Sequence, residues 1–388
     1  MRSKAPVIPA NPERILIIKP SSLGDIVHAL PVLVGLRAAH PTAHIAWLAG
    51  NAFAPLLDGH PLLDEVIRFD RRRYGRMLQS PRILAEFVRF VWGLRRRRFD
   101  LVIDLQGLVR SGFLAWASGV RRRVGFAAAR EFAWLFYTQR VRTPASGPAD
   151  CHAVDRNLAV GRSLGLPLDT PRFPLGLRAD ELAAARSLLA DAAGRPLDHF
   201  IAVIPGARWA SKRWPVARLA ALCTRLHAEG WPPCVLLGAP DDRTFAQELI
   251  AAGAGPVVDL VGRTSLRALS AALALADLVI CHDSGPMHIA AALGKPLVAL
   301  FGPTNPARTG PYGATARIVM RPLACAPCYR RTCPLGHHDC LAGLDVDTVL
   351  GHVREAWAVV TAAGAVNSAP TAQSAPERIS PPPFRAPA

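Results

Sequence analysis

Several loops of the chain end an apolar run with small polar residues and a charged group that could do chemistry. The first is RILIIKPSSLGD (14–25), where four apolar residues are followed by two serines, a glycine and Asp25. A carboxylate on a loop of small residues can reach a bound substrate, so Asp25 is a candidate general base. Asp25 could equally be the N-cap of a helix that begins at Ile26.

A second segment, DLVICHDSGPMHIAAAL (277–293), repeats this arrangement in the second half of the chain. Asp283 can accept hydrogen bonds from sugar hydroxyls. Ser284 and Gly285 let backbone N–H groups approach a ligand at the start of a helix, where the dipole favours an anion. Helix capping alone would explain the presence of one acid or serine at this position. A cap does not explain the glycine turn with His288 one turn later, so we interpret this segment as a binding site.

Two further loops carry charge after an apolar run. In IPGARWASKRWP (204–215), Lys212 is a candidate point charge for a diphosphate, although loop lysines are often only solvated. In LGAPDDRTF (237–245), Asp242 or its neighbour Asp241 could bind the hydroxyls of a ribose, as acids do in dinucleotide folds, or could cap a helix. The GxGxxG spacing of NAD-binding folds is absent from this loop.

These loops belong to a strand–helix rhythm that runs through both halves of the chain. The expected strands are short, apolar and separated by helical stretches, which is the pattern of buried parallel sheets. They lie at 14–20, 44–50, 65–70, 99–107 and 121–126, and again at 200–207, 234–240, 257–262, 277–285 and 296–304. A proline-rich stretch separates the halves, so we predict an α/β fold of two doubly wound sheets. Because ligands bind at the carboxyl ends of parallel strands, the charged loops are expected to face a cleft.

The composition suits two domains and indicates an anionic partner. The chain has 388 residues, is 51% hydrophobic and carries a formal charge of +17, with arginine runs at 71–73, 95–98 and 121–123. Such a charge favours binding to nucleic acid, to an acidic membrane surface or to a phosphorylated substrate. A genome whose codon usage prefers arginine would produce the same excess of positive charge. The sequence contains no apolar run of membrane-spanning length and no signal-peptide pattern, so a cytoplasmic location is expected.

Four of the eight cysteines are close together, in CAPCYRRTCPLGHHDC (325–340). Cys325, Cys328, Cys333 and Cys340 have the spacing C-x2-C-x4-C-x6-C, which suits a structural zinc ion or an iron–sulfur cluster. A reduced loop that packs near the last helix would explain them as well. The sequence alone leaves both interpretations open, and neither gives these cysteines a catalytic role.

Taken together and in order, these segments resemble the bacterial heptosyltransferases of lipopolysaccharide core synthesis, the family-nine glycosyltransferases. The matching motifs are KPSSLGDIVHALP, FDLVIDLQGLVRSG, AARE (128–131), HAVDR (152–156), KRWP, GAPDD, DSGPMHIAAALGKP and FGPTNPARTGPYG. Those of the first half look most like heptosyltransferase I. The family implies a GT-B fold of two Rossmann-like domains facing a cleft. We expect the acceptor domain at 13–170, the donor domain at 196–345, a last helix at 346–363 and a disordered tail at 364–388.

The resemblance also implies the chemistry: inverting transfer of heptose from ADP-heptose to a Kdo–lipid A acceptor, with no metal or other cofactor required for catalysis. Asp25 matches the base that deprotonates the acceptor hydroxyl. Lys212 matches the diphosphate contact, where negative charge builds up as the bond breaks. Asp283 matches the contact to the heptose hydroxyls. The resemblance also implies that Ser284 and Gly285 lie near the phosphates of the donor, with His288 nearby.

The loops that would hold the donor depart from the family pattern at three positions. Ala207 and Arg208 stand where the family has threonines before the lysine, so Arg208 would supply charge in place of hydroxyl contacts. Asp242 replaces a longer glutamate at the adenosine ribose, where a bridging water would be needed. Thr264, in VGRTSL, stands near the adenine.

An anionic acceptor at a membrane would account for the arginines. FVRFVWGLRRRRF (87–99) alternates apolar residues with a basic run, as an interfacial helix does, although a half-buried helix with a solvated face has the same pattern. Arg110 and Arg130 are the candidates for direct acceptor contact. The resemblance therefore implies a peripheral protein at the cytoplasmic face of the inner membrane.

Two other functions fit parts of the sequence. Another enzyme of the same fold, either heptosyltransferase II-like or a nucleotide-sugar epimerase, would use similar donor motifs. An epimerase acts on the donor alone and needs no basic acceptor side. A nucleic-acid binder would suit the charge, but no recognised binding motif accompanies it, so no nucleic-acid partner is expected.

Overall fold

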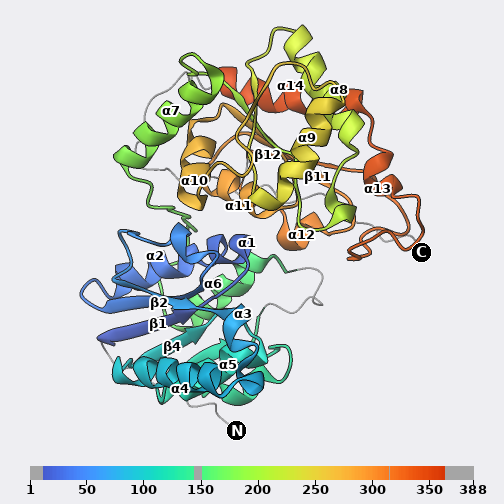
Figure 1. The fold of residues 1–388 in the computed structure, drawn as a ribbon. Coiled ribbons are helices and arrows are strands. Elements are labelled where there is room, and N and C mark those ends of the chain that lie inside the picture. The colour runs from blue at the N-terminus through green and yellow to red at the C-terminus, as the bar shows by residue number, and fades with distance from the viewer. Residues whose placement is uncertain (1–11, 144–150, 314, 363–388) are drawn as a thin grey trace. The chain divides into compact units, whose positions relative to one another are not determined.

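The computed structural model describes residues 12–143, 151–313 and 315–362 (Figure 1). The chain divides into two compact units, Met1–Gly176 and Leu177–Ala388, which we call the N-terminal and C-terminal units. Each unit contains one six-stranded parallel sheet, so the predicted α/β class with two doubly wound sheets is confirmed. The predicted tail, 364–388, lies outside the described residues.

The sheet of the N-terminal unit has the strand order β3-β2-β1-β4-β5-β6. Its strands are β1 (Arg14–Ile18), β2 (His44–Gly50), β3 (Glu65–Phe69), β4 (Leu101–Asp104), β5 (Arg122–Phe126) and β6 (Gln139–Val141). The central strand β1 pairs with both neighbours, Ile15 opposite Ile45 on one side and Leu101 on the other. Because β1 is covered on both faces, it contains apolar residues throughout rather than in alternation.

Helices cover both faces of this sheet. In Figure 1, α4 and α5 lie along one face, and α2 and α6 lie along the other. The helices are α1 (Leu23–Val27), α2 (Leu30–Ala39), α3 (Arg71–Tyr74), α4 (Pro81–Arg96), α5 (Val109–Ala117) and α6 (Ala153–Ser163), with short 3-10 turns η1 (Ala54–Leu56), η2 (Met77–Gln79) and η3 (Ala133–Phe136). The chain around Asp25 forms two helices, α1 and α2, because Pro31 is tolerated only near a helix start and occupies the first turn of α2.

The sheet of the C-terminal unit has the order β12-β11-β10-β7-β8-β9. Its strands are β7 (Ile201–Ile204), β8 (Cys234–Leu236), β9 (Val257–Asp259), β10 (Leu278–His282), β11 (Leu297–Phe301) and β12 (Ala316–Met320). The three strands β7, β10 and β11 are buried along their whole length. The loops after these strands leave the same edge of the sheet, which brings residues that are distant in sequence together.

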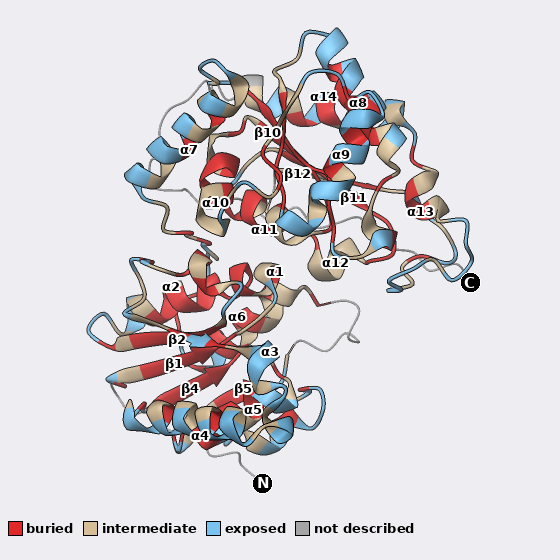
Figure 2. Cartoon of the chain, in the orientation of Figure 1, coloured by how far each residue is buried: buried red, intermediate tan, exposed pale blue. Residues whose placement is uncertain are grey.

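The helices of the C-terminal unit also form two layers (Figure 1). One layer contains α7 (Ala179–Ala193), α10 (Leu266–Leu275) and α11 (Gly285–Ala292), and the other contains α8 (Val216–Ala228), α9 (Arg243–Ala251) and α14 (Val346–Ala362). Shorter elements are η4 (Ala210–Lys212), η5 (Pro240–Asp242), α12 (Pro306–Thr309) and α13 (Asp339–Ala342). Figure 2 shows the strands as the buried layer and the outward sides of α4 and α7 as exposed.

The sequence analysis found ten of the twelve strands and missed β6 and β12. Both are edge strands: β6 is the three residues Gln-Arg-Val, and β12 has an arginine at its second position, so neither shows the continuous apolar run of a central strand. None of the helices within the described ranges has the length and apolar content that crossing a bilayer requires.

Candidate functional site

The loops after β7 and β10 bring Lys212 and Asp283 together in the C-terminal unit. Lys212 Nζ lies 2.6 Å from Asp283 Oδ2, and the two side chains are only 16% and 7% exposed. The Trp209 ring packs beside the ammonium group, with its centroid 4.6 Å from Nζ. Two of the predicted donor contacts therefore form one ion pair, in which a cation suited to a diphosphate lies next to a carboxylate suited to sugar hydroxyls.

Residues that the sequence analysis did not single out fix this ion pair. The buried Thr304 hydroxyl donates to Asp283 Oδ2 at 2.6 Å, so this oxygen accepts from two side chains. His282 Nε2 accepts from the Trp214 backbone N–H at 2.9 Å. Burial lowers the pKa of His282 to about 4, which keeps the ring neutral and able to accept. The strand end that carries Asp283 is thus tied to the loop that carries Lys212.

The start of α11 leaves polar groups available for a ligand. Ser284 occupies the N-cap position, yet its side chain makes no cap hydrogen bond, and its buried hydroxyl oxygen has no partner among the described residues. Gly285 is the first residue of the helix, and His288 is buried on the same helix. Helix capping is therefore not the role of the Ser284 side chain, and an anion or hydroxyl at this helix start would satisfy it.

Asp242 lies against the loop after β7. A Cβ atom on Gly206 would lie 2.0 Å from Asp242 Oδ1, so only glycine allows this approach. Asp242 Oδ2 accepts from the Ala239 N–H at 3.1 Å, and Arg213 lies 3.9 Å from the other oxygen. Burial raises the pKa of the Asp242 carboxyl. Asp242 is therefore positioned by the turn that contains it, and it is close to the loop that contains Lys212.

The other two predicted donor residues differ in exposure. The Thr264 hydroxyl oxygen is buried and has no hydrogen-bond partner among the described residues, which suits contact with a ligand. Arg208 is exposed on the same loop as Lys212, and its contact with a phosphate stays a prediction.

Asp25 in the N-terminal unit lies in the first turn of α1, which follows β1. It is not the N-cap of a helix beginning at Ile26, because α1 begins at Leu23 and Ser22 is its N-cap, but Asp25 does help to cap the helix, as the N3 residue of a capping box with Ser22. Asp25 Oδ2 accepts from the Ser22 N–H at 2.9 Å and from the Ser22 hydroxyl at 2.7 Å. Lys19 Nζ lies 3.5 Å from Oδ1, and 40% of the Asp25 side chain is exposed. The carboxylate is thus oriented by its neighbours and accessible to a substrate.

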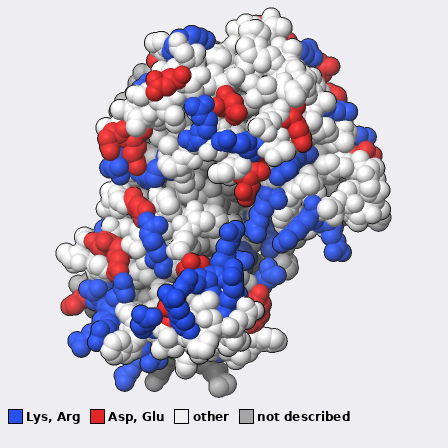
Figure 3. Space-filling view, viewed as in Figure 1, with Lys and Arg blue, Asp and Glu red and all other residues white. Residues whose placement is uncertain are grey.

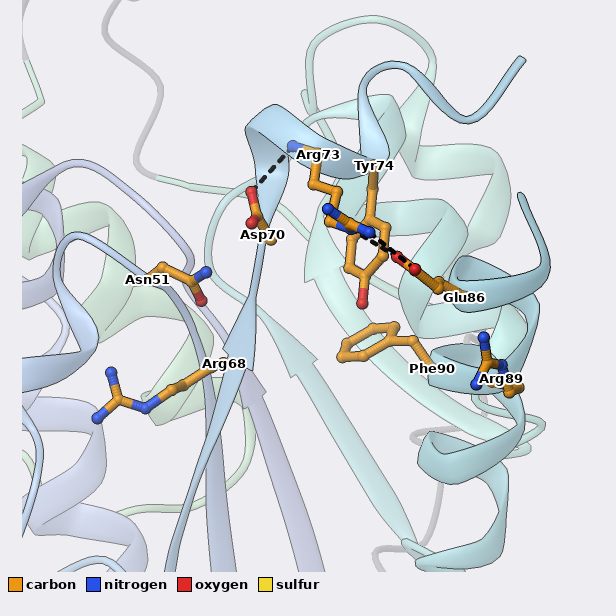
Figure 4. Close-up of a pocket in the computed structure, with 8 residues that line it drawn as sticks. All are labelled: Asn51, Arg68, Asp70, Arg73, Tyr74, Glu86, Arg89 and Phe90. Carbon is orange, nitrogen blue, oxygen red and sulfur yellow. Dashed lines mark hydrogen bonds and ion pairs between the residues drawn. The ribbon is translucent and has the colours of Figure 1, made fainter. Parts of the chain in front are cut away.

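The same unit contains a cavity of about 620 Å³ at the carboxyl ends of β2 and β3 (Figure 4). Arg68, Arg73 and Arg89 line it together with Tyr74 and Phe90. Glu86 forms a bidentate ion pair with Arg73, in which Arg73 Nε donates to Oε2 at 2.5 Å and Arg73 Nη2 donates to Oε1 at 2.7 Å. Asp70 and Glu86 also line the cavity, and Arg68 is paired with Asp58, so the guanidinium groups beside the aromatic rings are partly neutralised. The arginine run at 71–73 was the sequence signal for it.

Arg110 and Arg130, the predicted acceptor contacts, are both exposed. Arg110 is on the first turn of α5, and the Arg130 backbone N–H donates to Gly107 O at 3.0 Å. Neither residue lines the cavity of Figure 4. Their contact with an acceptor stays a prediction.

The cysteine segment packs against the Lys212 loop. All four clustered cysteines line one small cavity together with His337 and His338. In the described parts of the chain, however, no three side chains of His, Cys, Asp or Glu form a group that could hold a metal ion. His338 Nε2 lies 2.7 Å from Ser211 O, and the Ser211 hydroxyl donates to Arg330 O at 2.6 Å. The segment therefore supports the residue that precedes Lys212.

Comparison with known proteins identifies the family. The sequence profile of glycosyltransferase family 9 (heptosyltransferase) matches residues 87–338. Lipopolysaccharide heptosyltransferase 1 of Pseudomonas aeruginosa is 33% identical over 82% of this chain and 87% of that protein. The chain belongs to glycosyltransferase family 9.

Solved structures of the family have the same fold. The Escherichia coli heptosyltransferase WaaC with ADP superposes with a TM-score of 0.70, at 27% identity over 88% of this chain and 99% of that one. E. coli ADP-heptose lps heptosyltransferase II gives a TM-score of 0.72, at 25% identity over 91% and 100%. The GT-B fold and the assignment as a glycosyltransferase are therefore confirmed.

Proposed function

We propose that this glycosyltransferase transfers heptose from ADP-heptose to a Kdo–lipid A type acceptor, in synthesis of the lipopolysaccharide inner core. The observation that carries the proposal is the Lys212–Asp283 ion pair before the start of α11, followed by the Ser284 hydroxyl, which has no partner in the part of the chain that the structure describes. This set offers a cation, a carboxylate and a helix N-terminus to a sugar diphosphate. The similarity to proteins named lipopolysaccharide heptosyltransferase 1 supports the choice of sugar and acceptor.

In the proposed reaction, the Asp25 carboxylate accepts the proton of an acceptor hydroxyl. The acceptor oxygen then bonds to the anomeric carbon from the face opposite the leaving group, which inverts that centre. The bond from this carbon to the diphosphate oxygen breaks, and its electron pair leaves with ADP. Lys212 and the N–H groups at the start of α11 stabilise the charge that develops on the diphosphate, so these groups meet the need that a metal ion would otherwise meet. Asp283 orients the heptose through its hydroxyls.

The remaining predicted donor residues recognise the nucleotide in this proposal. Asp242 accepts from the ribose hydroxyls, through a water because its side chain is short. The Thr264 hydroxyl, which lacks a partner among the described residues, bonds to the adenine. Arg208 supplies positive charge to the phosphates, and His288 is part of the donor site near Ser284. The C-terminal unit is thus the donor-binding part of the enzyme.

The N-terminal unit is the acceptor-binding part. Its arginine-lined cavity (Figure 4) offers guanidinium groups to the phosphates and carboxylates of an anionic glycolipid, which would compete with Asp58 for Arg68 and with Glu86 for Arg73. Arg110 and Arg130 add exposed positive charge in the same unit. An acceptor of this kind lies in a membrane, so we place the enzyme at the cytoplasmic face of the inner membrane as a peripheral protein.

Mass analysis of lipopolysaccharide from a heptose-deficient strain tests this function. Expression of the wild-type chain is expected to lengthen the core by one heptose, and expression of Asp25→Ala is expected to leave it unchanged. An unchanged core with both proteins refutes heptose transfer, and equal extension with both refutes the role of Asp25. Purified enzyme gives a second test, since ADP release that needs no acceptor would indicate a hydrolase, and conversion of the donor sugar without net ADP release would indicate an epimerase.

A further inference from the structure

We propose that the outward face of α4, with the adjoining parts of α5 and η3, is the surface by which this protein docks on an anionic lipid bilayer. We call it the α4 face and define it by Leu84, Val88 and Trp92 together with Val109 and Trp116 of α5. The proposal builds on the proposed function, which places the acceptor in a membrane. It adds which surface of the enzyme meets the lipid.

The first observation is an exposed apolar stripe along α4. Leu84, Val88 and Trp92 are spaced four residues apart, so they project from one side of the helix. They are 43%, 57% and 56% exposed, although the adjacent side of α4 buries Phe87 and Leu94 in the core of the unit. Because burial of Phe87 and Leu94 already anchors α4, the exposed stripe is not required for the fold.

The apolar surface continues beyond α4. On α5, Val109 and Trp116 are exposed and seven residues apart, hence on one side of that helix. The ends of α4 and α5 are joined, since Arg95 Nε donates to Ala117 O at 2.7 Å. The turn η3, which packs on α5, exposes Phe132. The other exposed large apolar residues between positions 78 and 135 are Leu78 and Leu135.

The second observation is the charge around this surface. Residues 71–123 contain fourteen arginines and three acids, a net charge of +11 out of +17 for the whole chain. Figure 3 shows Lys and Arg side chains gathered over the N-terminal unit. Arg96 lies over the Trp92 ring, 3.7 Å from its centroid, so positive charge borders the apolar stripe directly. An anionic headgroup layer above an acyl core is complementary to this combination.

The third observation is the position of the acceptor cavity on the same helix. Arg89 and Phe90 of α4 line the cavity of Figure 4, whereas Val88 and Trp92 do not. Seen along the axis of α4, the exposed stripe, the residues that line the cavity and the residues that face the core follow one another around the helix. A bilayer against the stripe would therefore lie next to the opening through which a lipid-borne acceptor is recognised.

A lipid surface explains these features better than a nucleic acid does. Nucleic acids bind basic surfaces through stacking platforms or grooves, and here the aliphatic Leu84 and Val88 alternate with Trp92 in an outward stripe. Arginine and tryptophan beside aliphatic residues are typical of helices that lie in a membrane interface.

Vesicle flotation with the full chain tests the proposal. The probes are vesicles of phosphatidylcholine alone and vesicles containing phosphatidylglycerol, both without lipopolysaccharide precursors. Wild-type protein is expected to bind the anionic vesicles and to be released by salt. Val88→Ser/Trp92→Ala is expected to weaken the partition coefficient at least about tenfold. Arg82→Gln/Arg96→Gln is expected to weaken it by about fivefold per arginine, on anionic vesicles only.

The matched control is Ile250→Ser/Val359→Ser, which removes exposed apolar residues from the C-terminal unit and is expected to bind vesicles like the wild type. Equal binding by the wild type and Val88→Ser/Trp92→Ala overturns the docking surface. So does capture by a single-stranded oligonucleotide in place of vesicles. Heptose transfer to a deacylated, water-soluble acceptor separates the two proposals. Transfer without vesicle binding overturns docking alone, and vesicle binding without transfer overturns the proposed function alone.

Discussion

Replacement of Thr304 by valine tests whether the Lys212–Asp283 pair is held as the structure indicates. Valine keeps the shape of threonine and removes the hydroxyl that donates to Asp283 Oδ2 at 2.6 Å. A hydrogen bond to a charged group contributes about 1.5–3 kcal/mol, and Asp283 is too deeply buried for water to replace the donor fully. We therefore expect Thr304→Val to lower the free energy of unfolding by about 2 kcal/mol.

Thermal unfolding of the full chain measures this effect. In a unit of this size, 2 kcal/mol corresponds to a fall in Tm of about 4–8 °C for the transition of the C-terminal unit. The conservative control is Thr304→Ser, which keeps the hydroxyl and loses one buried methyl group, at a cost of about 1 kcal/mol. Thr304→Ser should also keep kcat close to that of the wild type, whereas Thr304→Val should lower it, because Asp283 is then less firmly oriented.

A double-mutant cycle decides whether the effect passes through Asp283. In an Asp283→Asn background, the Thr304 hydroxyl no longer meets a charge, so Thr304→Val should cost about 1 kcal/mol less than in the wild-type background. Equal costs in the two backgrounds would refute our account of this contact. A Thr304→Val protein as stable as the wild type would refute it as well.

Three further changes probe other parts of the site. Asp25→Asn should lower kcat by about 10²- to 10⁴-fold and leave ADP affinity unchanged, as measured by initial rates and calorimetry; weakened ADP binding would contradict a role confined to the acceptor. Gly206→Ala should weaken ADP binding, because its Cβ would lie 2.0 Å from Asp242 Oδ1, and unchanged affinity would argue against Asp242 as a nucleotide contact. Because the pKa of His282 is lowered to about 4, the folded state binds fewer protons than the unfolded state below pH 6.5. The contribution of His282 to stability is therefore complete above pH 6.5, and the free energy of unfolding falls by about 3 kcal/mol as the pH drops to 4. His282→Gln should remove this pH dependence, as measured by chemical denaturation.

Apolar runs were sufficient to predict the central strands, because a strand buried on both faces must be apolar along its length. Strand β6 was missed because only one of its three residues is apolar, and β12 because Arg317 interrupts its apolar run. The edge strands β3 and β9 were predicted, so edge position alone does not explain the misses. Asp25, Lys212 and Asp283 were proposed as site residues because each follows a predicted strand, and the family resemblance supplied their roles. Loops at strand ends are where parallel sheets bind ligands.

The sequence by itself determined the chain's class: two parallel sheets, an acid after the first strand, and charged loops at strand ends in the second half. Only the tertiary structure decided that Lys212 and Asp283 form an ion pair and that Thr304 holds it. It also decided that His282 is a neutral acceptor for the Trp214 loop. The physical reason is that strand periodicity is local in sequence. Contacts between loops after β7, β10 and β11 depend on the strand order, which no single segment encodes.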